Sequence, residues 1–282
     1  MVLVTSGGGL GGMVLSPLNA ALLERWGGLV GGLTLAVLAI GLVVPLALWV
    51  VKDGPEALGL AADGKPTSVE AGSPELAPAD EPVWTLTQAM RTRAFWAIAV
   101  SFHLAMIAQV GFLTHQVPFL QPIFGLLGSA TVVTTTTLLG AVGGVSFALF
   151  SHRGSPHRWA AGVFALLAAS LLLSAVGRTP WVLIAGSAVF GLPMMVLVAL
   201  LPVTTAECFG NRSFGRIYGV IYTLYCFGTA LGPLLLGFLA TVLGSYQPAL
   251  LLVTACPLLA AILIRWAIPP TLGINEVRNA VA

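Results

Sequence analysis

Long stretches without charge constrain this chain more than any other feature of its sequence. Between Ala94 and His152 there is no Asp, Glu, Lys or Arg, and similar runs cover 1–23, 26–51 and 217–264. A bilayer core about 30 Å thick is crossed by roughly 20 apolar helical residues, and helices or closed barrels alone satisfy every backbone polar group there. Charged residues make up 8% of the chain, against about 25% in ordinary soluble domains. The sequence excludes a water-soluble globule and predicts an all-α polytopic membrane protein.

Turn-forming residues divide these runs into eight expected transmembrane helices. The long run is broken by Pro118, Pro122, Gly125 and Gly128, and the last run is broken at Gly244, Ser245 and Pro248. Two further spans cover about 159–176 and 180–203. Because Met1 begins almost inside an apolar span with no positive region before it, we expect a membrane helix there and not a signal peptide.

Lysine and arginine placement predicts the orientation, because cytoplasmic loops carry the excess of these residues. If the first helix starts in the cytoplasm, only Arg25 and Arg178 lie outside. Both termini are then cytoplasmic, in what we expect to be a bacterial inner membrane. The segment 52–93 is rich in Pro, Asp and Glu, which favours a mobile cytoplasmic tether. The domains expected on this basis are a two-helix segment 1–51, a central loop 52–93, a six-helix half 94–270 and a tail 271–282.

Several function classes are disfavoured. A net charge of +2 and the lack of a basic run argue against binding of nucleic acid. The sequence has no Gly-x-x-x-x-Gly-Lys loop, which argues against a bound nucleotide. The cysteines are far apart, so we expect no metal and no cofactor. The expected spans hold no Asp or Glu, which argues against a membrane enzyme. The expected partners are the lipid bilayer and a small solute, with a pore or structural subunit as the alternative.

Polar residues inside the spans are the candidates for a solute pathway, because each is costly in lipid and usually faces the bundle interior. The candidates are His103, Gln109, His115, Gln116, Asn19, Tyr222 and Tyr225. Part of the set on the span after Ala94 can share one helix face, and an imidazole there could exchange protons. For each candidate, an ordinary interhelical hydrogen bond remains the alternative.

Charged residues at the expected cytoplasmic ends are candidates for a gate. They are Arg153, Glu207, Arg212 and Arg216. Exposed ion pairs are usually worth under about 1 kcal/mol, so these residues are equally well read as topology signals.

The beginning of the chain resembles a segment near its end. Gly7, Leu10 and Gly11 align with Gly228, Leu231 and Gly232 at a constant offset. The first and seventh spans are therefore six helices apart, which two parallel six-helix halves would produce.

Several motifs together resemble the major facilitator superfamily, in particular its oxalate:formate antiporter and monocarboxylate-transporter-like branch. They lie at 7–27, 54–64, 93–96, 115–118, 207–219 and 228–246. The resemblance implies a secondary transporter that works by alternating access, possible proton coupling, and helices five to twelve of a twelve-helix fold. The first four helices would then be absent, with a complete eight-helix protein as the alternative. It also implies that the spans beginning near Leu29, Trp159 and Pro248 face lipid.

One motif departs from this branch. Where relatives carry a membrane arginine that pairs with a carboxylate substrate, this chain has Gly144, and His152 stands at the position of an aspartate. A carboxylate in a low-dielectric cavity needs a cation or several donors. Either the absent helices supply that cation, or the solute is neutral or zwitterionic, or activity is lost. An oxalate-like solute is disfavoured, and a monocarboxylate-like compound stays open.

Overall fold

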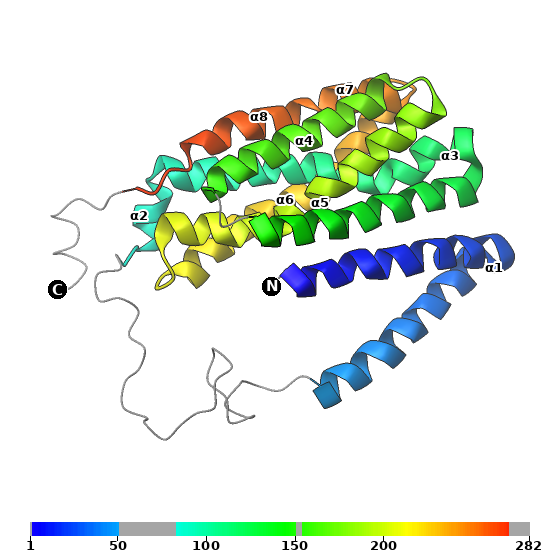
Figure 1. Cartoon of the computed structure of the whole chain (residues 1–282), viewed down its shortest axis with the longest axis horizontal. Helices are drawn as coiled ribbons and strands as arrows, with labels where there is room; N and C mark the ends of the chain where they lie inside the picture. Colours follow the sequence, from blue (N-terminus) through cyan, green and yellow to red (C-terminus); the bar gives the residue numbers. More distant parts are fainter. Residues whose placement is uncertain (1, 51–82, 151–153, 271–282) are drawn as a thin grey trace. The chain divides into compact units, whose positions relative to one another are not determined.

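The structure is a computed structural model that describes residues 2–50, 83–150 and 154–270, and helices with short turns make up these ranges (Figure 1). It separates into two compact units, residues 18–81 and the rest of the chain. The elements are α1 (Val2–Val50), α2 (Leu86–Met90), α3 (Arg93–Phe150), α4 (Pro156–Val176), α5 (Pro180–Phe209), α6 (Phe214–Val242), α7 (Tyr246–Val253), α8 (Ala255–Leu263) and the short 3₁₀ helix η3 (Ile264–Trp266). The predicted all-α membrane architecture is confirmed.

Two helices are too long for one crossing, and each is broken by a glycine. α3 has 58 residues and is interrupted at Gly125, where φ is 69° and ψ is 178°. α1 has 49 residues and is interrupted at Gly27, with φ 78° and ψ 171°. These backbone angles are open to glycine and strained for residues with a Cβ. Each break lies beside the predicted boundary between two spans.

Six helices of the described residues are long and apolar enough to cross a membrane, and they include α3 as a single helix and the 21-residue segment Tyr246–Trp266. Because α3 is broken at Gly125, it accounts for two predicted spans, the third and the fourth. The part of α1 after Gly27 accounts for the second predicted span of the chain. The helices run further than the charge-free stretches. Glu24 lies in α1, and Glu207 lies in the last turn of α5, so the expectation that spans exclude acidic residues holds only away from helix ends.

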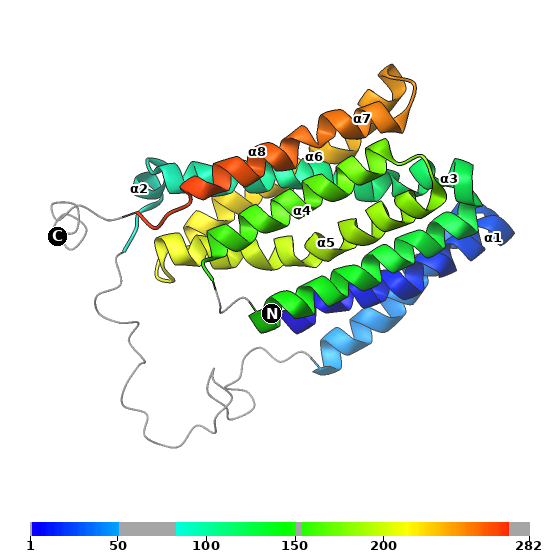
Figure 2. The same ribbon diagram turned by 45° about the horizontal axis from the view of Figure 1, so that its top comes forward.

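Residues 83–270 form a helical bundle organised around α3 (Figures 1 and 2). α3 packs against both α5 and α6, while α4 packs against α5 and α8. Fully buried phenylalanines fill the interior of the bundle. Phe102 meets Phe164 edge to face at 5.2 Å between ring centroids, and Phe112 meets Phe190 at 4.8 Å. Aromatic contacts of this geometry hold α3 against α4 and α5.

The end of the predicted tether is structured. Thr85 caps α2 through reciprocal hydrogen bonds with Gln88, which is a capping box. Trp84 is 4% exposed and meets Phe209 edge to face at 5.6 Å. Trp84 therefore anchors this segment to the end of α5, and α2 packs against α3 and α6. Residues 51–82 and the tail 271–282 lie outside the described residues.

Exposure does not follow the expected pattern of lipid-facing spans. In the most apolar window of Ala21–Trp49, 6% of residues are buried, as expected for an outer helix. However, the buried share of the corresponding window is 50% for both α4 and α5, 39% for Tyr246–Trp266 and only 17% for α6. The buried shares do not distinguish α4 and Tyr246–Trp266 from the other helices, so their exposure to lipid stays a prediction.

Candidate functional site

The two histidines of α3 both point to the backbone of α6. His103 Nδ1 lies 2.8 Å from the Leu224 carbonyl oxygen, and His115 Nε2 lies 3.0 Å from the Pro233 carbonyl oxygen. A carbonyl oxygen only accepts, so these nitrogens carry the hydrogens. His115 Nδ1 lies 3.1 Å from the Tyr246 hydroxyl. His115 thus joins three helices, α3, α6 and α7.

Small residues allow this close approach of α3 and α6. A Cβ on Gly228 would overlap the His103 carbonyl oxygen, and a Cβ on Gly232 would overlap that of Ile107. A Cβ on Gly237 would come within 3.2 Å of the His115 ring. Glycine at these positions lets the helix backbones meet, as small residues do in membrane helix interfaces.

The two glutamines of α3 point instead to α5 and to the second half of α3. Gln109 Nε2 donates to the Met194 carbonyl oxygen at 3.2 Å. Gln116 Nε2 donates to Thr136 Oγ1 at 2.9 Å, and that hydroxyl lies 3.0 Å from the Ser187 carbonyl oxygen. The Oε1 atoms of both glutamines are buried and have no hydrogen-bond partner among the described residues. In each glutamine, therefore, the amide nitrogen has a hydrogen-bond partner and the amide oxygen has none among the described residues.

The candidates of α3 consequently separate into two groups. Gln109 and Gln116 share a face, as the spacing allowed, but His103 lies on a different face that contacts α6. Sequence reasoning missed Thr136 as the link between Gln116 and α5. Thr136 Oγ1 also lies 3.1 Å from the Val132 carbonyl oxygen of its own helix.

Tyr222 and Tyr225 belong to an aromatic stack along α6. Phe214, Tyr218, Tyr222 and Tyr225 stack in succession, with centroid separations of 4.8, 5.5 and 5.3 Å. Tyr222 is 45% exposed, so its ring lies at the surface of the bundle. The stack orients these hydroxyls along one side of α6.

The remaining candidates are not brought together with these residues. Asn19 is half-buried on α1, which belongs to the other unit from residue 18 onward. Arg212 and Arg216 are exposed, and the electrostatic partner of Glu207 within the described residues is His157 on α4. Arg153 lies outside the described residues. The gate therefore stays a prediction.

Comparison with known proteins identifies the fold. The sequence profile of the Major Facilitator Superfamily matches residues 1–233. The chain belongs to this superfamily. Rat monocarboxylate transporter 12 (Rattus norvegicus) is 26% identical over 93% of this chain and 58% of its own length. Mouse monocarboxylate transporter 12 (Mus musculus) is 29% identical over 55% of this chain and 30% of its own length.

These matches confirm the resemblance to the superfamily and to its monocarboxylate-transporter-like branch. The chain spans less than two thirds of the length of either relative. The superfamily points to transport and not to catalysis.

In the described part of residues 83–270, charge is confined to helix ends. At one end of the bundle lie the arginines Arg91, Arg93, Arg158, Arg212, Arg216 and Arg265, and Arg178 lies at the other. Gly144 is buried. The described bundle therefore offers an anionic solute imidazole and amide groups, and no buried cation.

Proposed function

We propose that the chain is part of a secondary active transporter that moves a small organic solute across the membrane by alternating access. The match of the Major Facilitator Superfamily profile to residues 1–233 carries this proposal. The relatives' names support a monocarboxylate-like compound as the first solute class to test. We further place it in a bacterial inner membrane with both termini cytoplasmic, in line with the excess of arginine at one end of the bundle.

The proposed pathway lies along α3, between the two histidines that contact α6 and the two glutamines on the other face. His103 and His115 face α6, Gln109 faces α5, and Gln116 faces the second half of α3. Movement of α5 or α6 against α3 therefore changes which polar groups are available. The unpartnered Oε1 atoms of the glutamines can accept hydrogen bonds from a solute or from water. Asn19, Tyr222 and Tyr225 remain candidates for the same pathway, and Arg153, Glu207, Arg212 and Arg216 for its cytoplasmic gate.

Proton coupling would remove the need for a buried cation, which the described residues do not provide. A carboxylate that enters together with a proton crosses without net charge, and so avoids the desolvation cost of an unpaired anion. His103 is the better placed of the two imidazoles, because only its Nδ1 has a partner among the described residues, whereas both nitrogens of His115 are engaged.

The test is flux into proteoliposomes that contain the purified chain. We expect saturable uptake of a small monocarboxylate such as lactate, acceleration by an inward proton gradient, and counterflow when the vesicles are preloaded with unlabelled solute. Zwitterionic and neutral solutes of similar size are the comparison. Flux that increases linearly with concentration, without counterflow, would indicate a pore, and no flux for any solute would indicate an inactive or incomplete carrier.

A further inference from the structure

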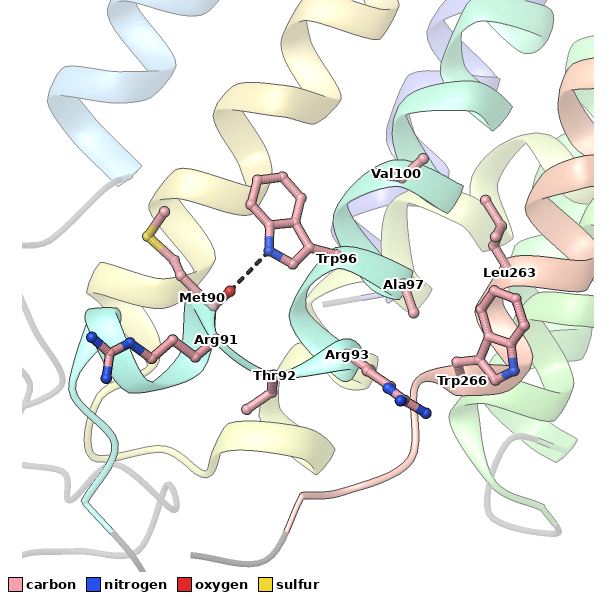
Figure 3. A pocket seen from close by; sticks show the side chains of 9 residues that line it. All are labelled: Met90, Arg91, Thr92, Arg93, Trp96, Ala97, Val100, Leu263 and Trp266. Carbon is pink, nitrogen blue, oxygen red and sulfur yellow. Dashed lines mark hydrogen bonds between the residues drawn. The ribbon is translucent and has the colours of Figure 1, made fainter. Parts of the chain in front are cut away.

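A cavity of about 490 Å³ lies at the arginine-rich end of the bundle, and none of the polar pathway candidates of α3 lines it. Figure 3 shows its lining, which comes from α2 and the turn after it, the first two turns of α3, and the ends of α8 and η3. The lining residues are Met90, Arg91, Thr92, Arg93, Trp96, Ala97, Val100, Leu263 and Trp266. None of them is a candidate for the solute pathway, and none belongs to α5 or α6.

The rim of the cavity carries positive charge without any acidic residue in the lining. Arg91 and Arg93 flank Thr92, and both are exposed. In Figure 3 the guanidinium of Arg93 extends toward Trp266, while that of Arg91 extends to the opposite side. Guanidinium groups bind phosphate oxygens through paired hydrogen bonds, so this rim suits a phosphate group.

Below the rim the wall is apolar. Ala97 and Val100 face the cavity from α3, and Leu263 faces it from the segment Tyr246–Trp266; both are long and apolar enough to cross a membrane. A free phosphate ion would gain nothing from this surface, whereas an acyl chain would lie along it. The wall therefore favours a ligand that is anionic at one end and apolar at the other.

Two tryptophans lie at the junction of rim and wall. Trp96 is 47% exposed, and its Nε1 donates to the Met90 carbonyl oxygen at 2.8 Å, which fixes the indole between α2 and α3. Trp266 is 58% exposed. Tryptophan concentrates at the level of lipid headgroups, because its ring is apolar and its N–H is polar. The junction thus lies where a headgroup meets its acyl chains.

We propose that this cavity binds the headgroup of an anionic phospholipid, with its phosphate at the Arg93 guanidinium beside Trp266, Arg91 adding positive charge to the rim, and an acyl chain along Ala97, Val100 and Leu263. Basic pockets between membrane helices bind anionic lipid headgroups in this way. The bound lipid bridges the start of α3 and the end of α8. The segment after the undescribed part of the central loop is thereby tied to the bundle.

The test is lipid binding to the full-length chain in detergent, followed by native mass spectrometry. Phosphatidylglycerol and phosphatidylcholine with the same acyl chains are titrated separately. We expect the wild type to bind phosphatidylglycerol about tenfold more tightly, and R91Q/R93Q to lose that preference, since each arginine contributes attraction to an anionic lipid. Equal binding of the two lipids by the wild type would overturn the proposal.

Three variants separate the cavity from general surface charge. R178Q removes one exposed arginine from the other end of the bundle and is expected to keep the preference for phosphatidylglycerol. R91K/R93K keeps the charge and is expected to retain most of the preference for phosphatidylglycerol. V100W fills the wall and is expected to weaken binding of phosphatidylglycerol while leaving both arginines in place. Unchanged binding in V100W, or the same loss in R178Q as in R91Q/R93Q, would contradict the proposed site.

Folding and free phosphate are controlled in the same titration. Thermal unfolding in phosphatidylcholine micelles shows whether R91Q/R93Q folds, and R93Q alone takes its place if it does not. Inorganic phosphate at millimolar concentration is expected not to displace phosphatidylglycerol. Displacement by phosphate would show that the rim recognises a soluble anion, and the lipid proposal would fail.

Discussion

His103 and His115 have the same side chain and contact the same helix, yet their environments give them different chemistry. His115 uses both ring nitrogens, with Nε2 donating to the Pro233 carbonyl and Nδ1 facing the Tyr246 hydroxyl. His103 uses Nδ1 alone toward Leu224 among the described residues. A histidine with both nitrogens engaged must break a hydrogen bond or reverse one to exchange a proton. We therefore expect His115 to be structural and His103 to be the residue that exchanges a proton.

The structural assignment of His115 predicts energetic coupling to Tyr246. H115F removes two hydrogen bonds and Y246F removes one, and membrane interhelical hydrogen bonds average about 0.6 kcal/mol. We expect each variant to lower the free energy of unfolding in SDS, and the double variant to lose less than the sum, with a coupling energy of about 0.5 kcal/mol. Strict additivity would show that the 3.1 Å contact contributes nothing.

The assignment of His103 predicts a change in pH dependence without a change in stability. Gln at position 103 can still donate a hydrogen bond toward the Leu224 carbonyl, but it has no ring nitrogen that can take up and release a proton. We expect H103Q to flatten the acceleration of monocarboxylate uptake by external acid, measured in proteoliposomes between about pH 5.5 and 8. H115Q is the matched control and should keep the acid dependence. If H103Q kept the wild-type profile, the proton would have to be exchanged elsewhere.

The sequence indicated which residues of α3 are polar and internal, but not which helix each one faces. Gln109 and Gln116 are seven residues apart, so their common face followed from helix periodicity. That His103 and His115 both reach α6 depends on how α3 and α6 cross, which periodicity within one helix does not contain. The role of Tyr246 was missed for the same reason, because it joins residues 131 positions apart.

At the scale of elements, α3 and α6 meet along two rows of residues spaced by four. His103, Ile107 and Gly111 form the row on α3, and Gly228 and Gly232 lie in the row on α6. Rows with this spacing form the ridges that pack helices together. Because the contact involves backbone atoms, added volume cannot be absorbed by rotation of a side chain.

This geometry predicts opposite effects for two glycine-to-alanine substitutions in α6. G228A places a Cβ against the His103 carbonyl oxygen, so the helices must separate, at a cost of about 1–3 kcal/mol. G219A meets nothing within 4 Å, and alanine favours the helix by about 1 kcal/mol relative to glycine. We expect thermal unfolding of the purified chain to occur at a lower temperature for G228A and at the same or a higher temperature for G219A. Equal unfolding temperatures would contradict the close packing of α3 and α6.

The element boundaries were largely predictable, because charge-free length and turn-forming residues define them. The break at Gly125 follows from the clustered prolines and glycines, and the turn at Gly244 from its polar neighbour Ser245. The docking of residues 83–92 was not predictable, since the segment is short and mixes polar with apolar residues. Its stability comes from Trp84 against Phe209, a contact between segments distant in the sequence.

At the scale of the whole molecule, the distribution of arginine gives the bundle a polarity. Six of the seven arginines in the described part of 83–270 lie at one end, and Arg178 lies at the other. Lys and Arg are retained on the cytoplasmic side during membrane insertion. The same end holds the proposed lipid cavity, so an inner leaflet rich in anionic lipid would face Arg91 and Arg93.

The orientation is tested by labelling cysteines in intact cells and in inverted vesicles. A background without native thiols is made by replacing Cys208, Cys226 and Cys256 with serine, and then R178C or R212C is introduced. Both positions are exposed and lie between helices, so both should react with a maleimide that cannot cross membranes. We expect R178C to react in intact cells and R212C only in inverted vesicles, because the helix α5 between them crosses the bilayer once. Labelling of both from the same side would mean that α5 does not span, and the reverse pattern would place the arginine-rich end, with its cavity, outside the cell.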